Sequence, residues 1–207
     1  MINDPSDDQK IVENLSKIGI KVHSIYDLVN TTKSYPEAIP VLLDGLSWIK
    51  NNKVKEGVVR ALSVPEAKGV ANQKLIAEFE AIPSNSTTQE QMLKWTIGSA
   101  LAVVANRDNR DDLVRIAMCR RHGRSREMIV LALGNLPESS VGKVLTALLT
   151  DEDVALQAVI AIRKTGYLDA LPTLYSMRMH SKPLMRKEVE RAIKKLSNTA
   201  PPVLENP

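Results

Sequence analysis

The sequence has little cysteine, few aromatic residues and no long apolar run. One cysteine among 207 residues cannot form a disulfide within the chain, so the sequence predicts a protein of a reducing compartment, the cytoplasm. No apolar run reaches the ~18 residues of a membrane-spanning helix. The first eight residues also lack the basic and apolar regions of a secretory signal. We therefore expect no association with a membrane.

Motifs for catalysis or metal binding are lacking as well. The three histidines, His23, His122 and His180, are far apart in the sequence and have no partner at metal-ligand spacing. Cys119 is expected in the middle of a helix, as a small buried residue rather than a nucleophile. The chain has no glycine-rich phosphate loop and no nucleophile elbow. These absences predict a protein that is not an enzyme, with no catalytic residue, no metal and no cofactor.

The composition indicates a core of aliphatic side chains. Hydrophobic residues make up 43% of the chain, whereas aromatic residues make up only 3%. Alanine, leucine, isoleucine and valine must therefore fill the core, which suits closely packed helices. No segment shows the strict alternation of apolar and polar residues that is typical of a strand. The sequence predicts an all-α fold.

A recurring pair of an alanine and an aliphatic residue gives the chain an internal period. The alanines of successive pairs are 39, 32, 29 and 31 residues apart, which is the range of helical repeat proteins. A small side chain at a fixed position lets two helices approach closely, so we expect these alanines to be buried. The pairs are Ala61-Leu62, Ala100-Leu101, Ala132-Leu133, Ala161-Ile162 and Ala192-Ile193.

Two further features recur with this period. A segment with an acidic residue followed by alanine, an aliphatic residue and proline occurs at 37–40 and again at 169–172, and it suits the first turn of a helix. A basic residue also stands six positions before four of the five alanines. This residue either bonds groups of a neighbouring unit or lies in solvent. The four are Lys55, Lys94, Arg126 and Arg186.

With these features the chain resembles the HEAT-repeat family, including the short HEAT-like units of phycobilisome lyases, over residues 36–197. The resemblance implies a right-handed α-α superhelix, a solenoid of about five helical hairpins whose second helices line the concave side. We expect residues 1–35 to form an N-terminal cap of short helices. Residues 36–197 should form the repeat array of the same single domain, and residues 198–207 a disordered tail.

The expected hairpins follow from the apolar periodicity and from helix start signals. Thr87 and Glu90 predict a capping box after a polar insertion at residues 83–88. Asp151 is expected to cap the second helix of the fourth hairpin. The pairs are expected at 37–49 with 54–62, 67–82 with 89–105, 110–121 with 125–136, 141–149 with a helix carrying residues 155–162, and 169–179 with 182–196.

Charge is uneven along the chain. Residues 1–93 carry 10 basic and 12 acidic side chains, a balance of −2, whereas residues 94–207 carry 18 and 12, a balance of +6. Seven of the twelve arginines lie between Arg107 and Arg126. Arginine suits planar, bidentate recognition of a carboxylate or phosphate. The cluster is either a surface for an acidic partner or a solvated rim with local pairs between aspartate and arginine.

The sequence places a candidate binding surface on the third repeat and its neighbour. The turn at residues 120–124 joins two helices, so some of its basic groups must be exposed. Trp95 has mostly charged residues at the equivalent positions of other repeats. It is either an exposed anchor for a partner or a cover for the insertion at 83–88. The candidate residues are Lys94, Trp95, Arg120, Arg121, Arg124 and Arg126.

Three functions are compatible with such a repeat protein. The sequence favours a non-catalytic, monomeric scaffold that binds a protein or peptide, acidic in character, on its concave surface. The second function is nucleic-acid binding, as in the alkylpurine DNA glycosylases built of HEAT-like repeats. That family places several aromatic residues and a catalytic aspartate on the concave surface, whereas here only Trp95 fits. The net charge of +4 also leaves little capacity to neutralise phosphate. The third function, a chaperone for a cofactor, is disfavoured by the shortage of aromatic residues.

Overall fold

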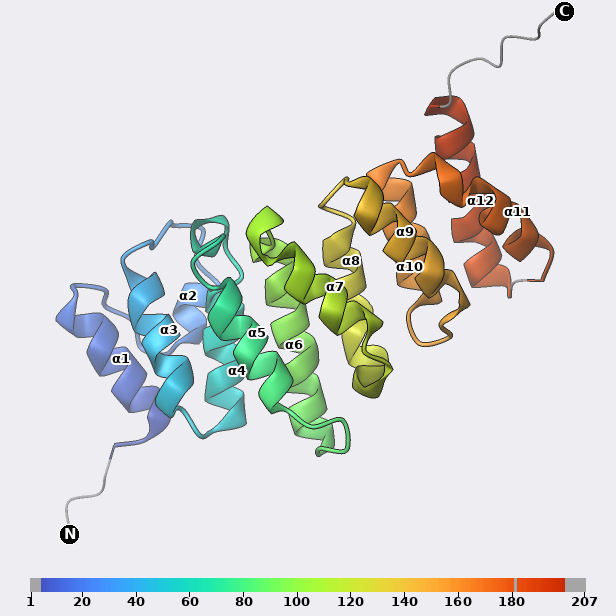
Figure 1. Ribbon diagram of the computed structural model, residues 1–207. Coiled ribbons are helices and arrows are strands. Elements are labelled where there is room, and N and C mark those ends of the chain that lie inside the picture. The colour runs from blue at the N-terminus through green and yellow to red at the C-terminus, as the bar shows by residue number, and fades with distance from the viewer. Residues whose placement is uncertain (1–4, 181, 200–207) are drawn as a thin grey trace, which may run out of the picture.

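The computed structural model describes residues 5–180 and 182–199, and every regular element in that part of the chain is a helix (Figure 1). The prediction of an all-α fold is confirmed. None of the helices in the described segments is both long enough and apolar enough to cross a membrane. The predicted tail at 198–207 is wrong for residues 198 and 199, which belong to the last helix, and its other residues lie outside the described ones.

Two short helices precede the array. Helix α1 (Asp7–Lys17) begins at a capping box formed by Ser6 and Gln9, and it buries Ile11 and Leu15 against α3. Helix α2 (Tyr26–Val29) has a single turn and packs against α4. The predicted short helices near the N-terminus are therefore present, and the second is shorter than the span 23–30 that the sequence suggested.

Five pairs of helices follow, and short 3₁₀ segments join several of them. The second helix of the second pair begins at the predicted capping box of Thr87 and Glu90, because each side chain satisfies the other residue's free backbone N–H group. The pairs are α3 (Ala38–Trp48) with α4 (Asn52–Ala61), α5 (Asn72–Ala81) with α6 (Thr88–Val104), α7 (Arg110–Met118) with α8 (Glu127–Leu133), α9 (Ser139–Ala147) with α10 (Ala155–Thr165), and α11 (Leu171–His180) with α12 (Pro183–Thr199).

The second helices of the pairs pack side by side in chain order. Contacts join α4 to α6, α6 to α8, α8 to α10 and α10 to α12, and the pairs succeed one another along an elongated molecule (Figure 1). We call these five helices the B layer. The alanines of all five recurring pairs are buried in it. A Cβ atom on Gly134 would lie 3.0 Å from the Cα of Ala161, so small residues do allow α8 and α10 to approach closely.

The third unit departs most from the prediction. Helix α7 ends at Met118, and residues Arg120–Arg126 form a 3₁₀ segment that is kinked at Gly123, whose φ of +51° favours glycine. Cys119 is consequently the half-buried residue that follows α7, and its predicted place in the middle of a helix is wrong. The expected cap at Asp151 is also wrong. Val154, which has no polar side-chain atom, occupies the N-cap of α10, and the Asp151 carboxylate accepts hydrogen bonds from Arg126 and from the backbone N–H of Asp153.

Candidate functional site

The arginine cluster between Arg107 and Arg126 is largely neutralised by carboxylates from other elements. Six of its seven arginines lie within 4 Å of an Asp or Glu oxygen, whereas Arg121 has no ion pair with any described residue. Several of these acids are distant in sequence, so the sequence alone did not reveal the pairing. The pairs are Arg107 with Glu138, Arg110 with Asp111 and Glu138, Arg115 with Glu80 and Asp112, Arg120 with Asp151, Arg124 with Glu127, and Arg126 with Asp151 and Asp153.

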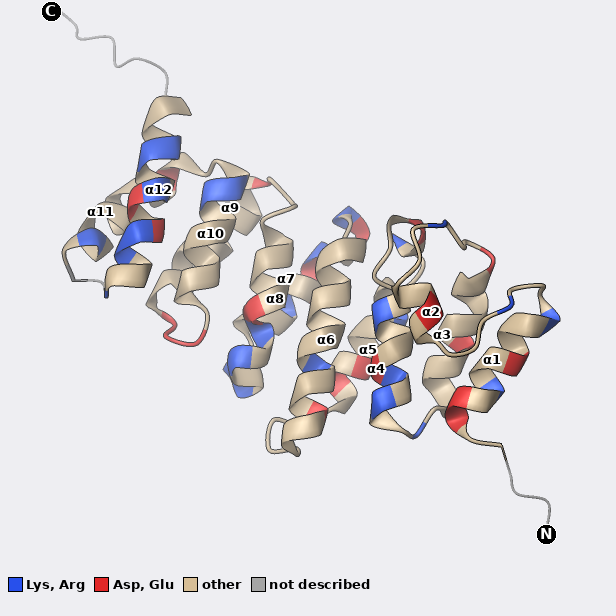
Figure 2. Ribbon diagram, turned by 180° about the vertical axis from the view of Figure 1, so that it is seen from behind, with Lys and Arg blue, Asp and Glu red and all other residues tan. Residues whose placement is uncertain are grey.

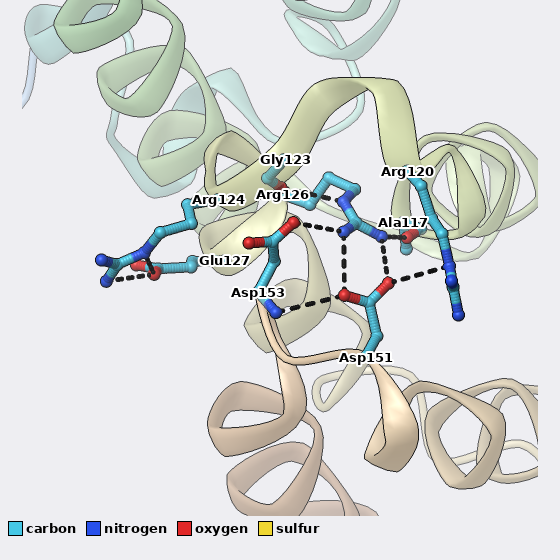
Figure 3. Close-up of polar contacts among 8 residues, drawn as sticks. All are labelled: Ala117, Arg120, Gly123, Arg124, Arg126, Glu127, Asp151 and Asp153. Atoms are coloured by element: carbon cyan, nitrogen blue, oxygen red, sulfur yellow. Dashed lines mark hydrogen bonds and ion pairs between the residues drawn. The ribbon is translucent and has the colours of Figure 1, made fainter.

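Arg126 is fully buried, so its prediction as a surface residue is wrong. Its guanidinium donates two hydrogen bonds to the carboxylate of Asp151, at 3.0 and 3.2 Å, and it also donates to the carbonyls of Gly123 and Ala117, each at 2.9 Å (Figure 3). Asp153 lies 3.5 Å from the same group. A buried guanidinium needs this many acceptors because it has lost its water.

Asp151 is the buried acid at the centre of this network. Its two oxygens accept from Arg126, one also accepts from the backbone N–H of Asp153, and Arg120 lies 3.6 Å away (Figure 3). Burial by itself would raise the pKa of Asp151, but the hydrogen bonds and positive charge of Arg126 outweigh burial and lower that pKa. The pair therefore joins the start of α8 to the loop before α10, that is, the third unit to the fourth.

Lys94 is also fully buried, and its prediction as a surface residue is wrong. Its ammonium donates to the backbone carbonyl of Ile82, contacts Nδ1 of His122 at 3.1 Å and lies 4.9 Å from the centre of the Phe79 ring. Burial lowers the pKa of Lys94. Because an ammonium only donates, Nδ1 of His122 accepts and the proton of the neutral ring is on Nε2. Lys94 thus ties the end of α5 to the loop after α7.

These contacts explain the basic residue that recurs six positions before the paired alanines. Lys55 on α4 bonds Glu78 on α5 at 2.9 Å, Lys94 on α6 contacts His122, and Arg126 bonds Asp151. Each side chain reaches from one unit to the next along the chain. The sequence left open whether this basic residue bonds a neighbouring unit or lies in solvent. At these three positions it bonds the neighbouring unit. The periodicity was the sequence signal for this role.

A cleft of about 440 Å³ lies between the insertion after α5 and the turn after α7. Gln91 organises one wall, since its amide donates to the carbonyls of Pro83 and Ser84 and its oxygen accepts from the hydroxyl of Ser125. Sequence reasoning missed Gln91 because a single glutamine carries no recognisable pattern. The lining residues are Ser84, Gln91, Trp95, Arg121, His122, Gly123, Arg124, Ser125 and Glu127.

Arg121 stands between this cleft and a second one of about 500 Å³, which also contains Cys119 and Arg115. Its side chain is exposed, and the clefts share it with Ser84 and His122. A guanidinium in this setting offers bidentate hydrogen bonds to an incoming carboxylate or phosphate. Arg121 is thus the predicted site residue whose environment best fits recognition of an anion.

Trp95 lies at the edge of the first cleft and is 44% exposed. The tryptophan therefore reaches the surface, which is one of the two possibilities that the sequence left open. Arg120 and Arg124 are exposed as well, although each lies beside a carboxylate, Asp151 and Glu127 respectively. Trp95, Arg121 and Arg124 therefore lie together at one cleft, and Arg120 lies on the same turn. Lys94 and Arg126 are buried in the interior instead.

No group of three or more histidine, cysteine, aspartate or glutamate side chains in the described residues is arranged to hold a metal ion. His122 and Cys119 both line the second cleft, but the nearest polar partner of His122 is Lys94, a cation. No family model matches the chain, and no curated protein matches it in sequence.

Proposed function

We propose that the chain is a non-catalytic scaffold that binds an acidic segment of a protein partner at the cleft between Trp95 and Arg121. The observation that carries the proposal is the contrast within the arginine cluster. Six arginines have carboxylate neighbours, whereas Arg121 is exposed and has no ion pair with any described residue. Arginine and tryptophan are both enriched among the residues that contribute most of the binding energy at protein interfaces.

The architecture we infer is a HEAT-like solenoid, a right-handed α-α superhelix with the B layer on its concave side. The side-by-side order of α4, α6, α8, α10 and α12 and the buried alanines of each unit support this inference. In such an array each unit contacts only its neighbours, which leaves one long surface for a partner. Lys55, Lys94 and Arg126 each join one unit to the next.

A protein partner is favoured over nucleic acid by the state of the basic groups. Binding to a phosphate backbone depends on many unpaired cations, because each neutralised phosphate releases counterions. Here most of the arginines that the sequence offered for that purpose are already beside carboxylates, and Arg126 and Lys94 are buried. Within the cluster, the single guanidinium without an ion pair to a described residue suits one carboxylate better than a run of phosphates.

The first test is a peptide selection on the immobilised chain, followed by fluorescence anisotropy with the selected acidic peptide. Its counterpart with asparagine and glutamine in place of aspartate and glutamate should bind more weakly. Arg121→Glu should weaken binding of the acidic peptide by about tenfold or more, since a hydrogen bond to a charged group contributes roughly 1.5–3 kcal/mol. Arg107→Glu is the matched control, because Arg107 is an exposed arginine of the same cluster that does not line the cleft.

Two results would contradict the proposal. Equal binding of the acidic peptide and its amide counterpart would show that Arg121 does not select a carboxylate. A single-stranded oligonucleotide that binds more tightly than any selected peptide, and that depends on Arg121, would favour the nucleic-acid alternative.

A further inference from the structure

The outward side of the B layer is apolar over its central helices. On α6 the inward positions are filled by buried residues such as Ile97 and Leu101, whereas Met92 and Trp95 point away from the core and are 60% and 44% exposed. Val103, two turns beyond Trp95, is exposed as well. These residues are separated by intervals that keep them near one side of a helix.

The next two helices of the layer continue this apolar surface. On α8 the buried residues are Ile129, Val130, Ala132 and Leu133. The partly exposed Leu131 lies on the opposite side, where Glu127 forms an ion pair with Arg124. On α10 the partly exposed Leu156 and Ile160 likewise lie opposite the buried residues. Because α6, α8 and α10 are neighbours, their outward residues lie on the same side of the B layer. We call Met92, Trp95, Leu131, Leu156 and Ile160 the apolar stripe.

Charged residues border the apolar stripe on both sides. On α4 the outward positions hold Glu56 and Arg60, which form an ion pair with each other. On α12 they hold Lys187, Arg191 and Lys194, and all three are exposed. Figure 2 shows basic segments on α12 and on the turn after α7, and only a few charged segments on the ribbons of α6, α8 and α10. The rim therefore has an excess of positive charge beside an apolar centre.

We infer that the apolar stripe binds an amphipathic helix of the partner, whose acidic N-terminal end lies at the cleft beside Arg121. This inference rests on the proposed function and adds the form of the ligand to it. Neighbouring packed helices lie about 8–10 Å apart. Residues seven apart in a helix are about 10.5 Å apart on the same side, so one helix can contact α6, α8 and α10 in turn.

The direction of the bound helix follows from the positive charge of Arg121. Acidic residues in the first turn of a helix are stabilised by the positive end of its dipole, so a carboxylate for Arg121 fits best at the N-terminal end. The stripe itself carries no charge, and each of its residues would desolvate an apolar side chain of the partner. The occupant is thus acidic at its start and apolar along one side, and it needs about 18 residues to span the three helices.

The test uses three synthetic peptides of that length and isothermal titration calorimetry. The first peptide has acidic residues in its first helical turn. Its apolar residues are seven apart, and further apolar residues fill the neighbouring positions on the same side of the helix. The second has the same composition in scrambled order, and the third replaces each acidic residue by its amide. We expect the first to bind most tightly and to gain helicity in circular dichroism when it binds. Equal binding of the scrambled peptide overturns the inference.

Variants of the chain distinguish the contribution of the apolar stripe to peptide binding from that of the cleft. The double variant Leu131→Ser with Ile160→Ser should weaken binding of the first peptide by roughly tenfold or more, as expected for residues at the centre of an interface. Val70→Ser is the matched control, because Val70 is an exposed apolar residue before α5. Melting midpoints confirm that each variant is folded.

The pattern of losses decides between the two proposals. If both Arg121→Glu and the double variant weaken binding, both proposals stand. Loss with Arg121→Glu alone keeps the proposed function and overturns the apolar stripe as a binding site. If neither variant binds less tightly than the parent chain, both proposals fail.

Discussion

Lys55, Lys94 and Arg126 occupy the same position in three successive units, and each of them contacts a group in the unit that follows. The contacts differ in strength because the environments differ. Lys55 and Glu78 are partly accessible to solvent, whereas Arg126 is fully buried and its partner Asp151 nearly so. An exposed pair contributes little to stability, but a buried charge that loses its partner is strongly destabilising.

The first prediction at the residue scale concerns Asp151. Asp151→Ala leaves the guanidinium of Arg126 without its bidentate acceptor and should lower the free energy of unfolding by about 3–5 kcal/mol, measured by urea denaturation at neutral pH. The neighbouring Glu152→Ala, at an exposed acid, should change it by less than about 0.5 kcal/mol. A loss of under about 1 kcal/mol for Asp151→Ala would show that solvent or another acid replaces the pair.

The second prediction at this scale concerns His122 and pH. Burial lowers the pKa of His122, and the charges of Lys94, Arg121 and Arg126 lower it further against the opposing effect of Glu80. The unfolded chain, with a histidine pKa of about 6.5, therefore binds a proton at a pH where the folded chain does not. Stability from this site is complete above about pH 6.5 and is lost as the pH falls toward the lower, folded value.

The expected result is a fall in the free energy of unfolding between about pH 7.5 and pH 5.5, a window above the titration of ordinary carboxylates. His122→Asn keeps an acceptor near Lys94 and should remove most of this fall. His23→Asn, at a fully exposed histidine, should leave it in place. A pH profile of His122→Asn parallel to that of the parent chain would contradict the prediction.

At the scale of elements, the packing of the B layer depends on small residues where helices cross. Gly134 on α8 faces Ala161 on α10, and a Cβ atom on Gly134 would lie 3.2 Å from the Cβ of Ala161. At the equivalent α6–α8 contact, a Cβ atom on Gly98 would meet Met128 at 3.3 Å. Gly98, Gly134 and Ala161 therefore help to set the distance between these helices.

Ala161→Leu should consequently overpack the contact between α8 and α10. We expect the free energy of unfolding to fall by about 1–3 kcal/mol, measured by thermal or urea denaturation. The adjacent Ile160→Leu, at a partly exposed position on the outward side, is the control and should be nearly neutral. An unchanged stability for Ala161→Leu would mean that the two helices can separate without cost.

At the scale of the whole molecule, the pairs of helices form a row rather than a compact bundle (Figure 1). The contacts recorded between elements join each pair mainly to its immediate neighbours. A row of units has more surface for its mass than a sphere. It exposes the entire outward side of the B layer, which allows a cleft on the third unit and the apolar stripe on α6, α8 and α10 to serve one partner.

The elongated shape can be tested in solution by small-angle X-ray scattering. A compact domain of 207 residues would have a radius of gyration of about 17 Å. We expect a clearly larger value and an asymmetric pair-distance distribution with a long tail, at protein concentrations where the mass is that of a monomer. A value near 17 Å with a symmetric distribution would rule out the row of units.

The sequence by itself determined the all-α fold, the order of the helix pairs and the buried alanines, because these follow from local periodicity and side-chain size. The capping box of Thr87 and Glu90 was predictable for the same reason, since both residues lie within one helical turn. Exposure of Trp95 was one of two possibilities that the repeat register left open.

Only the tertiary structure decided which basic side chains are exposed and without an ion pair. Arg126 and Lys94 looked like surface residues because their partners, Asp151 and His122, lie 25 and 28 residues away in the sequence. Asp151 looked like a helix cap because its buried partner was not visible from the residues near it. Ion pairs and burial depend on distances between units, and local patterns do not encode those distances. The free guanidinium of Arg121 could therefore be recognised only once the folded chain had paired its neighbours.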